Sequence, residues 1–276
     1  GSVNKPQSDY HLEFMTGNED FAREIVYVLK LFHIHAGLTE RKEEYVVYLK
    51  EGDAVTNCLQ VMGAQSALME FENVLPSEIE KRSFEIIESE LPYDIEKTIK
   101  PIVKRVIHTT ADFDYLDNLC FSENVVEIIK TAIKNGADIV TDTQMARSGI
   151  NKKRLASYGG EVHCFMSDED VAKAAKENGT TRAVASMEKA SKLEKDVIFA
   201  VGNAPTALIE LDKLIKNGQI NPIAIIGVPV GFVNVVQAKE LIMTSGVPYI
   251  VARGRKGGSN VAAAICNAII YDLKTD

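Results

Sequence analysis

The chain of 276 residues has room for one large domain or two small ones, and 46% hydrophobic with 25% charged residues is a globular composition. Its formal net charge of −8 disfavours nucleic acids and anionic membranes as partners, because long-range repulsion would oppose binding. The four cysteines are widely spaced without a CxxC pair, which argues against a disulfide framework or a cysteine zinc site and favours reduced thiols in a cytoplasmic protein.

The first 74 residues predict a small α+β segment. Residues 9–14 alternate like a strand, and residues 18–34 have helical spacing with Asn18 as the N-cap. A strand is expected after the charged turn within residues 38–50, and residues 53–74 are expected to be mainly helical. Twelve acidic residues against six basic ones give this segment a net charge of −6, which argues against DNA binding.

The second part of the chain, residues 75–276, predicts a different architecture, with a boundary near Leu75 and Pro76. Two helices at residues 75–91 and 94–110 lead into five short runs that are rich in valine and isoleucine. Continuous apolar runs separated by helices predict a parallel sheet of about five strands between two helical layers, a three-layer α/β/α fold. The runs are residues 137–143, 161–166, 196–203, 223–230 and 247–254.

Glycine and small polar residues follow these predicted strands, where ligands bind in open parallel sheets. The stretch "ARGRKGGSN" carries Arg253, Arg255 and Lys256 with three glycines directly before a predicted helix. A helix N-terminus presents free N–H groups and a positive dipole end, so this stretch predicts an anion site. The alternative is a solvated basic turn. The chain has no Walker spacing, and it also lacks GxGxxG, which disfavours a dinucleotide.

Several other residues have two interpretations from the sequence alone. His108, in "RVIHTTADFDY", is either a packed core histidine or a proton donor. Asp142 is either a catalytic carboxylate or the cap of the next helix. His163 is expected to be a hydrogen-bonded core residue within a strand. His33 and His35 alternate as in a strand, but without a visible third ligand they predict no metal site.

Eight stretches, in order through residues 76–276, resemble the precorrin-8X methylmutase family, which includes the cobalt-precorrin-8 methylmutases of vitamin B12 synthesis. Together they cover essentially all of this part of the chain. They are "SEIEKRSFEII", "RVIHTTADFDY", "GADIVTDTQMARSGINK", "VHCFMSD", "TTRAVASM", "AVGNAPTAL", "GVPVGFVNVVQAKE" and "YIVARGRKGGSNVAAAICNAIIY".

The resemblance implies an isomerase that moves a methyl group from C-11 to C-12 of a corrinoid, giving the cobyrinic acid skeleton. It implies no cofactor and no protein-bound metal, because any cobalt belongs to the substrate. The family's catalytic histidine lies in the VIH-type motif, which is His108 here, so a proton donor is favoured. An ordinary histidine pKa near 6.5 suits protonation of the conjugated ring.

The resemblance also implies a substrate site and an assembly. The corrinoid carries many carboxylates, which Arg253, Arg255 and Lys256 can pair with and which Arg182 can join. Family members are homodimers with sites near the subunit interface. The remaining residues expected to bind substrate are Ser83, Thr143, Asn203, Thr206 and Ser259.

The first 74 residues resemble the second LAGLIDADG-like half of the sporulation regulator WhiA, as a fused fragment without the preceding LAGLIDADG helix or a helix-turn-helix. Two alternatives to the enzyme stay open from the sequence. One is a corrinoid-binding or carrier protein that has lost turnover. The other is a fused regulator whose second part binds a ligand. The presence of His108 favours the enzyme over the carrier.

Overall fold

The computed structural model describes residues 2–3, 12–42, 44–62 and 79–273. The chain forms two compact units, residues 1–85 and 86–276. The domain boundary predicted between residues 74 and 75 lies outside the described residues and stays a prediction. A helix at residues 79–90 matches the described part of the helix expected at 75–91.

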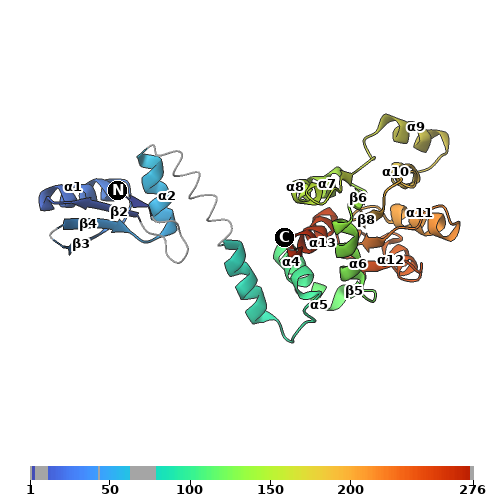
Figure 1. Cartoon of the computed structure of the whole chain (residues 1–276), viewed down its shortest axis with the longest axis horizontal. Coiled ribbons are helices and arrows are strands. Elements are labelled where there is room, and N and C mark those ends of the chain that lie inside the picture. The colour runs from blue at the N-terminus through green and yellow to red at the C-terminus, as the bar shows by residue number, and fades with distance from the viewer. Residues whose placement is uncertain (1, 4–11, 43, 63–78, 274–276) are drawn as a thin grey trace. The chain divides into compact units, whose positions relative to one another are not determined.

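Within the first unit, residues 2–3, 12–42 and 44–62 form a four-stranded antiparallel sheet with two helices (Figure 1). The helix at residues 79–90 begins in the same unit. The sheet order is β1 (Ser2–Val3), β2 (Leu12–Thr16), β4 (Glu44–Leu49) and β3 (Gly37–Arg41). The helices are α1 (Glu19–Leu31) and α2 (Gly52–Val61), which agrees with the predicted α+β composition.

Local signals in this unit were confirmed at the cap of α1 and at the strand after the charged turn, and wrong at the two histidines. Asn18 caps α1, because its Oδ1 accepts a hydrogen bond of 3.1 Å from the Phe21 amide. The strand expected after the charged turn is confirmed as β4, and the turn joins it in a hairpin to β3, which was not predicted. His33 and His35 do not lie in a strand, since His33 has a φ of 61° in the turn that ends α1.

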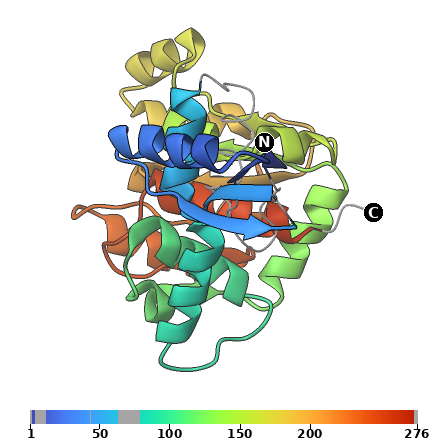
Figure 2. The same ribbon diagram turned by 90° about the vertical axis from the view of Figure 1, so that its left-hand side faces the viewer.

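The second unit contains a six-stranded sheet in the order β5, β10, β9, β8, β6, β7. The ribbon of this unit is coloured from green to red in Figures 1 and 2. The five predicted strands are confirmed and are parallel to one another. The sixth, β5, is antiparallel to β10 and was missed, because three residues give too short a pattern to recognise. The strands are β5 (Leu119–Phe121), β6 (Asp138–Thr141), β7 (Val162–His163), β8 (Val197–Val201), β9 (Ala224–Gly227) and β10 (Tyr249–Ala252).

Helices bury both faces of this sheet, which explains why its strands are apolar without alternation. Every residue of β8 is buried. Val197, Phe199 and Val201 belong to a core shared with α10, α11 and α12. The alternate residues Ile198 and Ala200 point to the opposite face, where α13 packs on β8 and β9.

Helix α13 is buried along most of its length because the sheet lies on one side and α4, α6 and α7 on the other. Its many alanines allow close approach; a Cβ atom on Gly149 of α7 would lie only 2.9 Å from the Cβ of Ala263. The helices are α4 (Lys100–Thr110), α5 (Tyr115–Asn118), α6 (Val125–Lys134), α7 (Gln144–Gly149), α8 (Lys152–Ala156), α9 (Glu169–Glu177), α10 (Arg182–Ala190), α11 (Pro205–Lys216), α12 (Val235–Met243) and α13 (Ser259–Asp272).

Asp142, directly after β6, fixes the carboxyl edge of the sheet. Its side chain is fully buried, and its Oδ1 accepts a hydrogen bond of 2.9 Å from the amide of Gly202. Its Oδ2 accepts bonds of 2.8 and 2.7 Å from the amides of Asn203 and Ala204. Burial raises the pKa of this carboxyl, and the three amide donors act in the opposite direction. One side chain therefore holds the whole turn that follows β8.

We expect Asp142→Asn to destabilise the second unit. The amide keeps one acceptor oxygen but turns an NH2 group towards a backbone N–H, so at least one buried donor loses its partner. The expected loss is roughly 2–3 kcal/mol in free energy of unfolding, measured by urea denaturation. Asp196→Asn, at an exposed position before β8, is the control and should leave the midpoint unchanged. Equal midpoints for the two variants would contradict this role of Asp142.

Candidate functional site

The turns that follow β6 and β8 meet the start of α13. Thr143 caps α7 by accepting a bond of 3.1 Å from the Ala146 amide, and its hydroxyl lies 2.7 Å from the Ser259 hydroxyl. A Cβ atom on Gly202 would lie 2.7 Å from both the Gly258 carbonyl oxygen and the Ser259 Cα, so only glycine allows this approach. Thr143 and Ser259, both expected to bind substrate, are thus brought together.

The basic loop, residues 253–258, is held by backbone bonds on both sides. Its Arg253 amide donates to the Asn118 carbonyl at 2.8 Å, and its Gly258 amide donates to the Val228 carbonyl at 2.9 Å. The Gly231 amide donates to the Arg255 carbonyl at 3.1 Å. The loop that follows β9 therefore supports the basic loop along its length.

The three cations of the basic loop differ in their surroundings. Arg253 and Arg255 are exposed, and the Arg255 guanidinium lies 5.3 Å from the centre of the Phe232 ring. Lys256 instead bonds to the carboxylates of Asp112 and Asp114, which raise the pKa of its ammonium. No local sequence pattern indicates this pairing, because the two aspartates lie more than a hundred residues before the loop.

Three more residues expected to bind substrate lie near the turn that follows β8. They are Arg182, Asn203 and Thr206. The Thr206 hydroxyl lies 3.4 Å from the hydroxyl of Thr181, which is the N-cap of α10 and directly precedes Arg182. Arg182 and Asn203 are exposed, and Thr206 is half-buried in the first turn of α11. The start of α10 and the turn after β8 are therefore neighbours.

His108 lies in the last turn of α4, and two contacts show which way this helix points. The Arg105 guanidinium lies 4.9 Å from the ring centre of Tyr271, near the end of α13. Lys256, three residues before α13, bonds to Asp112, which follows α4. The two helices therefore run in opposite directions, and the turn with His108 lies towards the carboxyl edge of the sheet. The His108 side chain is exposed.

Three other candidates have clear positions. Ser83 lies on the helix at 79–90, within the first compact unit, so its place in the substrate site stays a prediction. Asp142 was expected to act in catalysis or to cap α7; instead it is fully buried on three amides of the neighbouring turn, and Thr143 is the cap. His163 is hydrogen-bonded as expected, with its Nε2 3.0 Å from Asp138 Oδ2.

Two residues beside the basic loop were not predicted as site residues from the sequence. They are Lys239 on α12 and Phe232 on the loop after β9. Lys239 is 1% exposed and bonds to the basic loop, whereas Phe232 is 81% exposed beside Arg255. A lysine on the apolar face of a predicted helix was the available signal for the first. For Phe232, the available signal was the apolar stretch "GFV" in the glycine-containing turn that follows a predicted strand.

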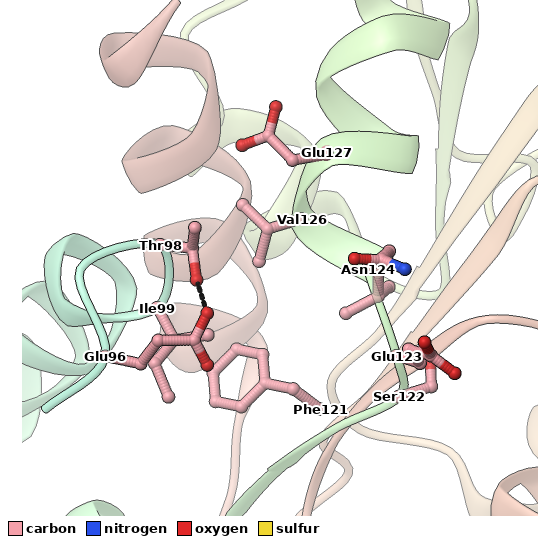
Figure 3. Close-up of a pocket in the computed structure, with 10 residues that line it drawn as sticks. Glu96, Thr98, Ile99, Phe121, Ser122, Glu123, Asn124, Val126 and Glu127 are labelled. Atoms are coloured by element: carbon pink, nitrogen blue, oxygen red, sulfur yellow. Dashed lines mark hydrogen bonds between the residues drawn. The ribbon is translucent and has the colours of Figure 1, made fainter.

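A hollow lies at the opposite, amino edge of the sheet (Figure 3). It is lined by the segment before α4, the end of β5 and the start of α6, and includes Glu96, Phe121, Glu123 and Glu127. Thr98 bonds to the Glu96 carboxylate within it. Three carboxylates disfavour an anionic ligand in this hollow, so the carboxyl edge is the better candidate for a polycarboxylate.

Within the described residues, no three His, Cys, Asp or Glu side chains are grouped so that they could hold a metal ion. The part of the chain that the structure describes also has no helix of the length and apolarity needed to cross a membrane.

Comparisons with known proteins match the two parts of the chain to two families. Residues 78–272 match the model of precorrin-8X methylmutase, and residues 1–78 match that of the WhiA LAGLIDADG-like domain. The cobalt-precorrin-8 methylmutase of Priestia megaterium is 46% identical over 71% of this chain and 88% of its own length. That of Salmonella typhimurium is 47% identical over 72% of this chain and 96% of its own.

A solved structure agrees with these matches. The crystal structure of precorrin-8X methylmutase from Thermus thermophilus superimposes with a TM-score of 0.66 at 40% identity, covering 71% of this chain and 95% of that one. A second structure, of a precorrin-8X methylmutase related protein, has a TM-score of 0.64 at 32% identity. Sequence, fold and the basic sheet edge thus agree, and the chain belongs to the precorrin-8X methylmutase family.

Proposed function

We propose that this chain is a cobalt-precorrin-8 methylmutase, an isomerase that moves a methyl group from C-11 to C-12 of its corrinoid substrate in cobalamin synthesis. Relatives with that name at 46% and 47% identity support the reaction. In the structure, the basic loop supports this proposal most directly. It is fixed at the carboxyl edge of the sheet by backbone bonds and exposes Arg253 and Arg255. An acidic protein needs such a local concentration of positive charge to bind a polycarboxylate.

The chemistry requires a proton and no change of oxidation state. The migrating methyl group leaves one ring carbon and bonds to another in the same molecule, so atoms and electrons balance without a co-substrate. Protonation of the conjugated ring withdraws electron density and eases the shift, and loss of that proton completes the isomerisation. We therefore propose that no cofactor is needed and that any cobalt belongs to the substrate.

His108 is the proposed general acid. It is exposed on the turn of α4 that points to the carboxyl edge, four residues before Asp112 and its bond to the basic loop. An imidazole ring can donate a proton from one of its nitrogens and take it back there, which suits a general acid whose proton is recovered at the end of the isomerisation.

His108→Ala should remove most turnover while leaving the fold and product binding intact. Loss of one general acid costs about 10²–10⁴ in rate, measured as single turnover at saturating substrate. His163→Ala is the control, because its bond to the buried Asp138 is structural. That variant should melt earlier but rearrange substrate at the normal rate. A His108→Ala variant with the normal rate would show that the position is not catalytic.

The substrate carboxylates are proposed to pair with Arg253, Arg255 and Lys256, and Arg182 is proposed as a further cation of the site. Thr143, Asn203, Thr206, Ser259 and Ser83 are proposed to contribute hydrogen bonds. Lys256 also neutralises Asp112 and Asp114, which would otherwise repel a polyanion near His108.

Arg253→Ala and Arg255→Ala should each weaken product binding by about 1–3 kcal/mol, as for lost charge-assisted hydrogen bonds. Titration followed by absorbance measures the affinity. Lys173→Ala, on the surface of α9, is the matched control and should bind normally. Unchanged affinity in both arginine variants would mean that the loop is only solvated.

We also expect Lys256→Ala to weaken product binding. This loss would have two possible causes, which a triple variant separates. If Lys256 binds the substrate directly, Lys256→Ala combined with Asp112→Asn and Asp114→Asn stays weak. If it only neutralises the two aspartates, the triple variant recovers the affinity.

We further propose that the protein is a cytoplasmic homodimer. Free thiols suit a reducing compartment, and the cysteines of this chain are free. They are Cys58, Cys120, Cys164 and Cys266. Phe232 and Val233 are 81% and 77% exposed at the loop after β9, and such apolar side chains are typical of a contact between subunits.

Residues 1–74 are proposed to be dispensable for catalysis, because the methylmutase match begins at residue 78. Deletion of residues 1–74 should therefore leave turnover per folded molecule unchanged. The truncated and full chains are compared in the same single-turnover assay after equal folding is shown by circular dichroism. A folded truncation with much lower turnover would show that residues 1–74 complete the site.

A further inference from the structure

Lys239 is a buried lysine whose ammonium contacts the backbone of the basic loop. It lies on α12 between the buried residues Ala238 and Ile242 of the same helix face, and only 1% of it is exposed. Its Nζ donates a hydrogen bond of 2.9 Å to the Gly254 carbonyl and one of 2.8 Å to the Lys256 carbonyl. The two bonds fix the backbone of the loop directly before and directly after Arg255.

Burying this ammonium is costly, which makes its presence informative. An ammonium taken out of water without a carboxylate loses most of its solvation, and apolar side chains of similar size would fill the space without that cost. Burial alone lowers the pKa of Lys239 to about 8. The carbonyl bonds satisfy two of its protons but do not balance its charge.

Among the residues that the structure describes, the charged groups on neighbouring elements do not supply the missing counter-charge. Glu240, next to Lys239 on α12, is exposed. Glu210 and Asp212 of α11, which packs on α12, are bonded to lysines of their own helix. The other titratable or charged groups on the facing segments are Tyr249 on β10, the cations Arg253 and Arg255, and Lys256 with its partners Asp112 and Asp114.

We propose that Lys239 is a positioning residue of the substrate site: it holds the basic loop so that Arg253 and Arg255 face outward, and it adds a buried positive charge that the substrate's carboxylates balance. This inference rests on the proposed function. It extends the anion site from the three cations visible in the sequence to a fourth that lies beneath them. The ligand chemistry it selects is a carboxylate on the ring periphery.

The first experiment compares Lys239→Met with Ile242→Val, using cobyrinic acid as the probe. Methionine replaces the side chain up to its last carbon with an unbranched apolar chain, and it removes both bonds and the charge. We expect product affinity to fall roughly tenfold or more and KM to rise, while the single-turnover rate at saturation changes little. Ile242, also buried on α12, lies about one helical turn after Lys239. Ile242→Val should lower the melting temperature and leave the affinity unchanged. This control separates the positioning of the loop from a general loosening of the helix.

The second experiment uses the wild-type protein and does not depend on a variant that folds. Raising the pH from about 7 to about 9.5 should remove the Lys239 charge, while arginines and an ion-paired lysine stay charged. A neutral amine still donates two hydrogen bonds, so the loop stays in place. We expect product affinity to fall with a midpoint near pH 8. In Lys239→Met the affinity should not change across this range.

The outcomes are distinct. A folded Lys239→Met variant that binds product like the wild type, or a wild-type affinity that is constant from about pH 7 to 9.5, would overturn this inference while leaving the proposed function intact. A wild-type protein that neither binds nor forms cobyrinic acid would overturn the proposed function, and this inference with it.

Discussion

The candidate site depends on one buried carboxylate, that of Asp142, which accepts three backbone N–H groups from the turn after β8. Such a turn has amide donors that regular strand pairing cannot use, and they need acceptors once they are buried. Because the turn is fixed, Gly202 can pack against Gly258 and Ser259 without a gap. The start of α13, and with it the end of the basic loop, is thereby placed against the sheet.

Electrostatics at this edge follow from the contrast between an acidic chain and a basic loop. The net charge of −8 disfavours polyanions in general, so attraction has to be built locally. Arg253 and Arg255 are exposed, Lys256 is matched by two aspartates, and Lys239 lies beneath the loop. The resulting charge is concentrated where helix α13 also presents its N-terminus.

The helix α4 connects this charged edge to the proposed chemistry. Its antiparallel packing on α13 brings its C-terminal turn to the same edge as the basic loop, and the bond between Lys256 and Asp112 closes that arrangement. His108 gains its position from this packing, because nothing in its immediate neighbours in sequence distinguishes an exposed ring from a packed one. The acidic hollow at the other edge lies by the start of the same helix.

The sequence by itself determined the layer architecture, the five parallel strands, the Asn18 cap and the edge at which glycines and cations gather, because these follow from local periodicity and from strand direction. It did not determine the three-residue strand β5 or the hairpin of β3 and β4, whose patterns are too short or too charged to recognise. Only the tertiary structure decided that Asp142 holds amides sixty residues away, that Lys256 is shared with Asp112 and Asp114, and that Lys239 is buried under the loop. These contacts join residues distant in sequence, so they depend on how the helices pack on the sheet and leave no local pattern.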